Sequence, residues 1–456
     1  MRIPRLLSSI LLLGLAGFAP AHAASDFPFV PLPAKIAPSS VAYSEWEWDE
    51  TPVFAAPEPR TVAGHVKSWY TSNSTAGFAS PAAARAWYAD TLKALGAQLV
   101  RAATPADKPW LSQRAALSAE VVKRTHANEP GLKFYDSYHL QQGEVNAWFT
   151  VVISDQPSNT WVQVVQEKPL VPGVHPMTSF PWLDWPDAMP PQSRCCEVEN
   201  QAQGSLRVLD GSTLRTVNGH LLQRMFPSSA LRWSPGAVRR QHGEALRLMG
   251  GIRVNERSPA DPAWRQQQAG NLSAVLKSMK LPDGPPWSYD DYLVRTPFGA
   301  IWASVRLIDD GNTTQLLTLE TVMPSPEIQA AVTPAVVAAS LAQLGRLELF
   351  VDFAGGAADW PAGTEASVNS LVQWLQQHPR EHLEIQGHTD LQGNPAALQA
   401  LSLRRAQALQ QQLLARGIDA ARLAVRGFGG DQPLLNTPSA AGQPTRARLT
   451  VVVRTP

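Results

Sequence analysis

The chain has 456 residues, a length that predicts about two to four domains. Its 39 Lys and Arg and 38 Asp and Glu leave a formal net charge of +1. This balance argues against a nucleic-acid-binding protein, because such proteins usually present a strongly basic domain or face. With 44% hydrophobic residues, the chain is apolar enough to form real cores, and long disordered stretches are not expected.

The first 23 residues have the composition of a secretory signal peptide. Arg2 and Arg5 begin a basic segment, a mostly apolar stretch follows, and residues 21–23 (Ala-His-Ala) form a small-x-small cleavage site. A membrane anchor is the alternative, but crossing a bilayer takes roughly 20 apolar residues and this stretch is shorter. We therefore expect cleavage after Ala23, export, and no transmembrane span in the mature chain.

The two cysteines, Cys195 and Cys196, are adjacent in the sequence. Lone thiols usually pair in an oxidising compartment, although neighbouring residues can close only a strained ring. A metal site needs more ligands than this pair supplies, and no Cys or His cluster stands beside it. We expect a structural or incidental role, with a vicinal disulfide or a redox role as alternatives, and we expect neither a metal nor a cofactor.

The middle of the chain contains an internal repeat with a constant spacing of 154 positions and no gap. Two segments, FYDSYHLQQGEVNAWFTVVISD and SYDDYLVRTPFGAIWASVRLIDD, share identical residues at several positions. The identical aromatic and acidic pairs are Tyr135 and Tyr289, Asp136 and Asp290, Tyr138 and Tyr292, Trp148 and Trp302, and Asp155 and Asp309. Gly, Asn, Asp and Pro lie between β-rich runs in both copies, which predicts a β-hairpin in each.

A helix is expected before each hairpin. Ser80-Pro81 begins the first and Gly96 ends it, and Ser258-Pro259 begins the second, so that Trp87 and Trp264 take similar places. The predicted fold class is α+β multidomain. It comprises two related modules, residues 24–170 and 171–330, each a sheet covered on one face by a helix. A βαβαβ-type domain at residues 331–456 follows them.

The repeated aromatic residues are better interpreted as sheet core and cross-strand pairs than as a ligand cage. The sequence contains no G-x-S-x-G, H-E-x-x-H or P-loop motif, and His65, His126 and His139 lack metal-ligand spacing. Nothing in this half of the chain indicates catalysis, so we predict that the protein is not an enzyme.

The last 120 or so residues alternate between strand and helix patterns. The run LELFVDF predicts a strand, and residues 365–378 form an amphipathic helix that Pro379 ends. LEIQGH is the next strand, and a helix capped by Asn394-Pro395 extends to Arg416-Gly417. RLAVRGFG and RLTVVVR are the final strands.

This region resembles the OmpA-like peptidoglycan-binding domain family over roughly residues 335–456. The matching residues are Gly387-His388-Thr389-Asp390, Leu401-Ser402-Leu403-Arg404-Arg405-Ala406, Gly417-Ile418, Gly427-Phe428-Gly429, Pro433 and Asn436. The combination is specific, although each element alone is weak. The resemblance implies non-covalent binding of peptidoglycan, the cell wall of Gram-negative bacteria.

The resemblance also implies a ligand site. In the family, an Asp after the second strand holds the ammonium of the stem-peptide diamino acid, and an Arg fifteen residues later holds its carboxylate. Those positions are Asp390 and Arg405 here. The pairing suits meso-diaminopimelate, which ends in a zwitterion, because the planar guanidinium of Arg donates two parallel hydrogen bonds to a carboxylate. The alternative is an Asp390–Arg405 salt bridge without a ligand.

Helix geometry supports Arg405 without reference to the family. At about 100° per residue, Arg405 falls inside the apolar stripe of its helix, whereas Arg404 falls at the edge of that stripe. The leucines of the stripe are Leu398, Leu401, Leu409 and Leu413. An inward-facing Arg needs an anionic partner or ligand, because an unpaired buried charge is very costly.

The predicted ligand site also includes His388, Thr389 and Arg446. His388 is interpreted as a residue packed beside the site, with a metal ligand as the alternative. The family usually has Asn-Arg-Arg-Val near its end, whereas this chain has Arg446-Ala447-Arg448-Leu449, so the common pocket Asn is Arg446. That change could weaken binding or shift the preference toward a more anionic stem. Phe353 is followed by Ala where the family usually has an acidic residue.

Together these features predict an exported envelope protein of the periplasm, or one associated with the outer membrane. Its C-terminal domain would bind the diaminopimelate stem peptide of peptidoglycan, and its N-terminal modules would contact another envelope protein. An envelope hydrolase with catalytic N-terminal modules is the alternative. A subunit of a motor stator or transport complex would instead need an uncleaved membrane helix.

Overall fold

The computed structural model describes most of the chain after residue 26. The described residues are 27–55, 58–115, 122, 125–177, 179–194, 197–231, 233–284, 286, 288–296, 299–308, 311–321, 332–354, 356–389, 393–430 and 448–454. The predicted signal peptide, Cys195, Cys196, Asp309, Asp390 and Arg446 lie outside these ranges. The chain divides into two compact units, Met1–Pro169 and Leu170–Pro456, and each is described by itself.

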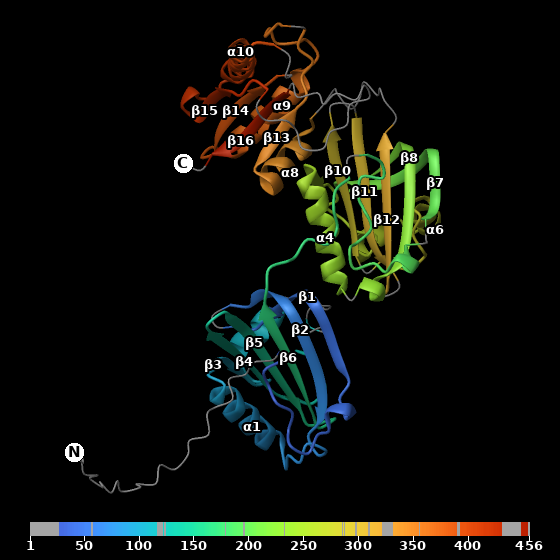
Figure 1. Ribbon diagram of the computed structural model, residues 1–456, viewed down its shortest axis with the longest axis vertical. Helices are drawn as coiled ribbons and strands as arrows, with labels where there is room; N and C mark the ends of the chain where they lie inside the picture. The colour runs from blue at the N-terminus through green and yellow to red at the C-terminus, as the bar shows by residue number, and fades with distance from the viewer. Residues whose placement is uncertain are drawn as a thin grey trace, which may run out of the picture. The chain divides into compact units, whose positions relative to one another are not determined.

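The first unit is built on a six-stranded sheet in the order β1-β2-β6-β5-β4-β3 (Figure 1). All its strand pairs are antiparallel. The elements are β1 (Tyr43–Val53), β2 (Arg60–Ser72), α1 (Pro81–Ala94), β3 (Gln98–Ala103), α2 (Lys108–Ala115), β4 (Leu132–Gln142), β5 (Val145–Ser154) and β6 (Asn159–Glu167).

Side chains alternate between the two faces of this sheet, as the twofold period of a strand requires. On one face, Phe149 of β5 shares a buried core with Tyr88 and Leu92 of α1. On the other face, Trp110 of α2 packs with Tyr135 of β4. The sheet is therefore covered by helices on both faces, whereas the sequence predicted a helix on one face only.

The second unit begins with a six-stranded sheet whose order, β7-β8-β12-β11-β10-β9, repeats that of the first. Helix α4 packs against β9, β10 and β11. The elements are β7 (Glu197–Asp210), β8 (Thr213–Pro227), α4 (Pro235–Leu248), β9 (Gly251–Arg253), α5 (Pro262–Gln267), α6 (Leu272–Ser278), β10 (Ser288–Thr296), β11 (Gly299–Ile308) and β12 (Thr313–Thr321).

The prediction of one long helix from Ser258-Pro259 onward was wrong, and so was its match with the helix that begins at Ser80-Pro81. That stretch forms two short helices, α5 and α6, because residues 268–271 (Gln-Ala-Gly-Asn) form turns between them. The counterpart of α1 is α4, which lies 154 positions later. Ser80 and Ser234 cap the two helices through their side chains.

Trp264 accordingly corresponds to Trp110 and not to Trp87. Each of these tryptophans is buried beside the first Tyr of the repeated strand, Tyr135 in one sheet and Tyr289 in the other. The segments TPADKPW and SPADPAW, which end at Trp110 and Trp264, already carry this match in the sequence.

A buried ion pair joins helix to sheet in both units. Arg85 of α1 donates from Nε and Nη2 to the carboxylate of Asp136, with both distances 2.7 Å. At the positions 154 residues later, Arg239 donates from both nitrogens to Asp290. Asp136 and Asp290 are 2% and 1% exposed, so each carboxylate depends on its arginine for solvation.

The C-terminal sheet has the order β13-β16-β14-β15, in which only β14 and β15 are parallel. The expected helix 365–378 coincides with α9. The elements are α8 (Pro334–Leu344), β13 (Arg346–Leu349), α9 (Glu365–Gln377), β14 (His382–His388), α10 (Pro395–Leu414), β15 (Leu423–Gly427) and β16 (Arg448–Arg454).

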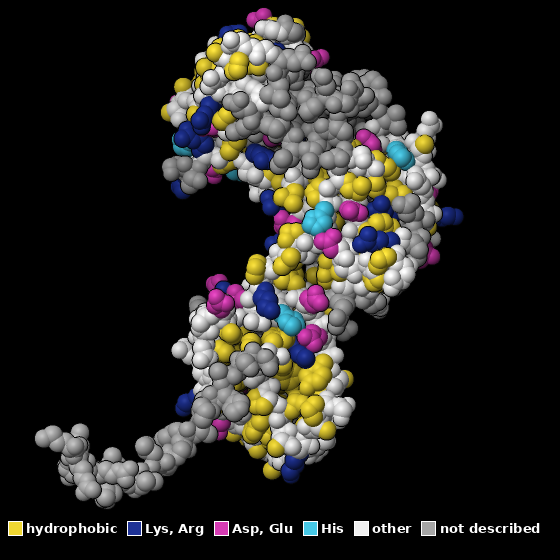
Figure 2. Space-filling view, viewed as in Figure 1, with side chains coloured by type: hydrophobic (Ala, Val, Ile, Leu, Met, Phe, Trp, Pro, Cys, Tyr) yellow, Lys and Arg dark blue, Asp and Glu magenta, His cyan; other side chains and the backbone are white. Residues whose placement is uncertain are grey.

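In the described part of the chain, none of the helices is both long and apolar enough to cross a membrane. Basic and acidic side chains lie interspersed on the face of the molecule that Figure 2 shows. This distribution agrees with the near-neutral charge of the chain.

We expect Arg85→Gln to destabilise the first unit by about 3 kcal/mol at pH 8, because it leaves a buried carboxylate without its cation. Burial already raises the pKa of Asp136, and Arg85 opposes that shift. Without Arg85 the pKa of Asp136 in the folded protein rises further above its value in the unfolded chain. The folded state then loses stability as pH rises through this folded-state pKa. The destabilisation by Arg85→Gln should therefore be smaller at pH 5 than at pH 8.

The measurement is amide hydrogen exchange of β4 in the full chain, relative to wild type at each pH. Arg60→Gln is the matched control, since the Arg60 side chain is 55% exposed and its surface contact contributes less than about 1 kcal/mol. Equal protection in Arg85→Gln and wild type at pH 8 would contradict the prediction.

Candidate functional site in the C-terminal domain

The candidate site lies where α10 meets the ends of β14 and β15. Two glycines allow the helix to lie directly on these strands. A Cβ atom at Gly387 would lie 1.9 Å from the backbone oxygen of Ser402, and one at Gly427 would lie 2.6 Å from that of Gln399. Any larger residue at either position would force the helix away from the sheet.

Helix α10 begins where the sequence predicted. The Asn394 side chain accepts hydrogen bonds from the backbone nitrogens of Ala396 and Ala397, at 3.0 and 3.3 Å. From this start, Arg405 faces inward with 7% exposure and Arg404 is exposed, which confirms the prediction from helix periodicity.

Arg405 is held by the segment that follows β13. Its Nε donates to the backbone oxygen of Ala357 at 2.9 Å, and its Cζ lies 4.7 Å from the centre of the Phe353 ring. A guanidinium stacked in this way keeps a fixed plane, which a bidentate contact to a carboxylate requires. The Phe353 ring therefore contributes directly to the site by holding Arg405.

His388 ends β14 and is 1% exposed. Its ring stacks on Phe428 with a centroid distance of 5.4 Å and an interplanar angle of 8°. Among the described residues, neither ring nitrogen has a hydrogen-bond partner. Burial lowers the pKa of His388 to about 3, and the positive charge of Arg448 adds to the shift, so the imidazole is neutral at physiological pH.

Thr389 and Gly429 tie the end of β14 to α10. The Thr389 nitrogen donates to the Gly429 oxygen at 2.8 Å, and the Gly429 nitrogen donates to Ser402 Oγ at 2.9 Å. The buried Thr389 Oγ1 has no partner within the described part of the chain. His388 and Thr389, immediately before Asp390, thus carry three buried polar atoms that have no hydrogen-bond partner among the residues described.

A second buried arginine, Arg448, lies opposite His388 in the β14–β16 pair. Its Nε donates to Glu348 Oε2 at 3.0 Å, and Thr450 Oγ1 donates to the same oxygen at 2.6 Å. Burial lowers the pKa of Arg448, and the nearby Glu348 carboxylate opposes that shift.

Sequence analysis did not identify Glu348 or Arg448 as site residues. The signal available was Glu348 inside the strand RLEL and Arg448 at the start of the apolar strand RLTVVVR. Of the five residues predicted from the sequence, the structure brings His388 and Thr389 together at the end of β14 and places Arg405 on the inward face of α10. Asp390 and Arg446 lie outside the described residues, and those described contain no cluster of three metal-ligating side chains.

Residues 353–447 match the model of the OmpA family. Outer membrane porin F of Pseudomonas fluorescens is 32% identical over 111 residues, which cover 24% of this chain and 34% of that protein. The peptidoglycan-associated lipoprotein of Brucella melitensis is 32% identical over 73 residues, 16% of this chain and 44% of that protein. The chain thus spans less than half the length of these relatives.

Among solved structures, the chain is similar to the peptidoglycan-associated lipoprotein from Burkholderia pseudomallei, with 26% identity and a TM-score of 0.21. That match covers 23% of this chain and 88% of the other.

The low pKa of His388 predicts a specific pH dependence of stability. Because the folded-state pKa lies below the ordinary value of 6.5, protonation favours the unfolded chain, and stability falls as pH drops below about 6.5. His388→Phe keeps a flat ring beside Phe428 and removes the titration. We expect the stability of wild type relative to this variant to fall by about 2 to 3 kcal/mol between pH 7 and pH 4.

Urea denaturation of the full chain at both pH values measures this difference. A constant difference would show that His388 titrates normally. His382→Phe serves as the control, because that histidine is at the partly exposed start of the same strand.

Proposed function

With an OmpA-family domain at residues 353–447 as the premise, we propose that this protein is an exported envelope protein that binds peptidoglycan non-covalently. The name of the Brucella relative, peptidoglycan-associated lipoprotein, supports this assignment for the shared region. We place the protein in the periplasm, either free or in association with the outer membrane, after removal of residues 1–23.

The observation that carries the proposal is a set of buried polar atoms, without a hydrogen-bond partner among the described residues, at the end of the strand against which the helix of the buried Arg405 packs. Buried polar groups are normally hydrogen-bonded, and exceptions commonly mark a site that a ligand completes. His388 and Thr389 supply such atoms directly before Asp390, and Arg405 is oriented by Phe353 and Ala357.

We propose that the ligand is the zwitterionic end of meso-diaminopimelate in the stem peptide. Arg405 would bind the carboxylate through two parallel hydrogen bonds, and Asp390 would bind the ammonium. Thr389 Oγ1 and the neutral His388 ring would contact the ligand beside them. Arg446 would add positive charge at the position where the family has Asn, and so favour a more anionic stem.

We further propose that the two N-terminal sheets are copies of one module with a binding role toward another envelope protein. The shared strand order, the capped helices and the matched Arg–Asp pairs support the duplication. The domains would then be residues 24–170, 171–330 and 331–456.

A polar cluster in the first unit, at Tyr70, His126 and Glu129, bears on the hydrolase alternative. Tyr70 donates its hydroxyl proton to Glu129 Oε1 at 2.7 Å, and His126 contacts the same carboxylate oxygen. Burial and Glu129 raise the pKa of Tyr70 above its ordinary value, so the hydroxyl stays protonated and is a poor nucleophile. Tyr70 is therefore not an activated nucleophile. As from the sequence, we propose that the protein is not an enzyme.

Substitution at the site should remove binding to isolated cell walls. We expect Asp390→Ala and Arg405→Lys each to weaken co-sedimentation of the mature protein with purified sacculi by about tenfold or more, since each loses a charge-assisted contact. Lys at position 405 keeps the charge but cannot donate in a fork. The exposed neighbour provides the matched control, Arg404→Lys, which should bind like wild type. Undiminished sedimentation of both site variants, with unchanged thermal unfolding, would contradict the proposed function.

The identity of the diamino acid can be tested by competition. A free stem tripeptide ending in meso-diaminopimelate should displace the protein from sacculi. The same tripeptide ending in L-lysine lacks the second carboxylate that Arg405 would bind, so it should compete about tenfold or more weakly. Equal competition by the two peptides would exclude recognition of the diaminopimelate end.

A further inference from the structure

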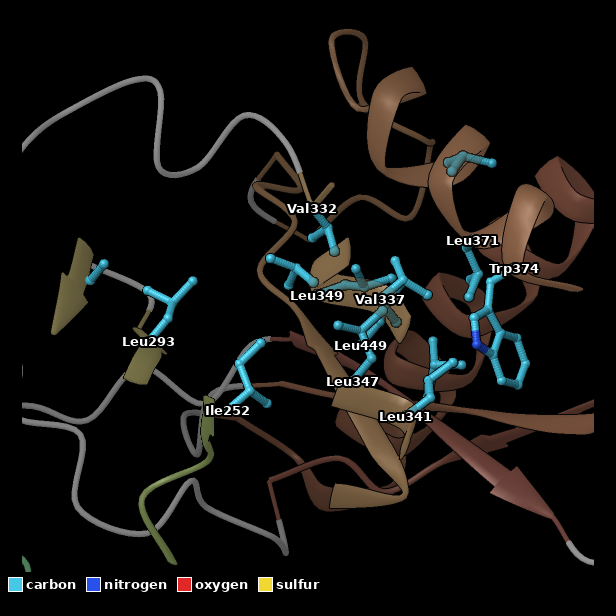
Figure 3. Close-up of a cluster of buried hydrophobic side chains, with 14 of the residues drawn as sticks. Ile252, Leu293, Val332, Val337, Leu341, Leu347, Leu349, Leu371, Trp374 and Leu449 are labelled. Atoms are coloured by element: carbon cyan, nitrogen blue, oxygen red, sulfur yellow. The ribbon is translucent and has the colours of Figure 1, made fainter. Parts of the chain in front are cut away.

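The second unit contains a packed junction between its first sheet and the C-terminal domain. Ile252 of β9 and Leu293 of β10 are 2% and 7% exposed. They belong to the same buried cluster as Leu341 of α8, Leu347 of β13 and Leu449 of β16 (Figure 3). The β9 edge of this sheet therefore lies against the domain that carries the candidate site.

Polar contacts fix this junction. Gln343 of α8 accepts from the backbone nitrogen of Arg253 and donates to its backbone oxygen, both at 2.9 Å. The side-chain amide thus pairs with the edge strand as a neighbouring strand would, which satisfies backbone groups that an edge otherwise leaves open. The Arg253 side chain reaches Asp290 at 3.2 Å, inside its own sheet.

Arg295 of β10 contacts the segment that begins at β13 and leads to Phe353. Its Nη1 donates to the backbone oxygen of Glu348 at 2.8 Å, and its Cζ lies 5.7 Å from the centre of the Phe350 ring. Burial lowers the pKa of Arg295 to about 10, and the charge of Glu348 opposes that shift. A partly desolvated guanidinium that donates to a carbonyl is a strong, directional anchor.

The segment that Arg295 anchors, residues 346–353, also holds both buried arginines of the site. The Glu348 side chain binds Arg448, which lies opposite His388, and the Phe353 ring stacks on Arg405. One short segment therefore connects the second sheet to Arg448 and Arg405 of the candidate site.

The first sheet lacks this junction at the corresponding positions. The residues 154 positions before Ile252, Leu293 and Arg295 are Gln98, His139 and Gln141. Gln98 and Gln141 are exposed. At these three positions the second copy therefore has two apolar side chains and one cation where the first copy has two glutamines and a histidine. Because the first sheet forms without them, these side chains serve the junction and are not needed to form the sheet itself.

We propose that Arg295, from the second sheet, is a positioning residue of the wall-binding pocket, acting through residues 346–353 on Arg405 and Arg448. This inference rests on the proposed function and deepens it, because a residue of the second module would then help to position the residues that bind peptidoglycan. A partner that binds the second module could then change wall affinity through the same segment, since coupling between sites requires a shared element that both can shift.

The test uses Arg295→Gln in the full mature chain. Glutamine is chosen because the first sheet has Gln141 at the corresponding position. Binding of a stem tripeptide ending in meso-diaminopimelate is measured by calorimetry. We expect affinity to weaken about threefold to tenfold, the range for a residue that acts at one remove from the ligand. Arg295→Lys keeps one donor for the Glu348 oxygen and should restore part of the loss. The matched control is Arg240→Gln, whose side chain is 53% exposed on α4.

Hydrogen exchange distinguishes positioning from general stability. In Arg295→Gln, exchange should become faster in residues 346–357 while β8 and β12 keep wild-type protection. Tripeptide affinity within twofold of wild type would overturn the inference, as would a lower unfolding temperature with unchanged affinity of the folded protein. Asp390→Ala distinguishes failure of the proposed function from failure of this inference. Normal tripeptide affinity in Asp390→Ala would refute the proposed function itself, whatever the result for Arg295→Gln.

Discussion

Helix α10 lies against β14 and β15 at a distance that only glycine permits. Because Gly387 and Gly427 have no side chains, the backbone of α10 at Gln399 and Ser402 reaches the two strands directly. That approach lets Ser402 accept from Gly429 and lets Gly429 accept from Thr389. The end of β14 is thereby held beside the helix that carries Arg405. A methyl group at either glycine would separate α10, with Arg405, from the strand end with His388 and Thr389.

Buried charges organise the rest of the molecule in a similar way. In each six-stranded sheet, one carboxylate accepts from an arginine of the covering helix, which fixes where that helix crosses the sheet. In the C-terminal domain, Glu348 of β13 binds Arg448 of the neighbouring strand β16. Such pairs give orientation more than net stability, because desolvation offsets much of their attraction. Their position between elements suits a protein whose proposed role is to hold two envelope components together.

In the internal repeat, the constant offset of 154 positions predicts which residues are structurally equivalent. The identities around Tyr135 and Tyr289 gave the constant offset of 154, and the structure places both segments in equivalent strands of sheets with the same order. The predicted match of Trp87 with Trp264 is wrong, because it relied on residue type and not on the offset. The same offset, applied strictly, matches Arg85 with Arg239 and Trp110 with Trp264. Spacing was therefore the stronger signal, since a fixed offset preserves every contact between helix and sheet at once.

The sequence by itself determined the start of α10, the inward direction of Arg405 and the adjacency of His388 and Thr389. These properties depend on local rules: a capping Asn, the period of a helix, and neighbours in the chain. Only the tertiary structure decided that Phe353 and Ala357 hold Arg405, that Glu348 binds Arg448, and that Arg295 of a distant strand contacts the segment linking them. Those contacts join residues 48 to 100 positions apart, and such separations leave no periodic trace in the sequence.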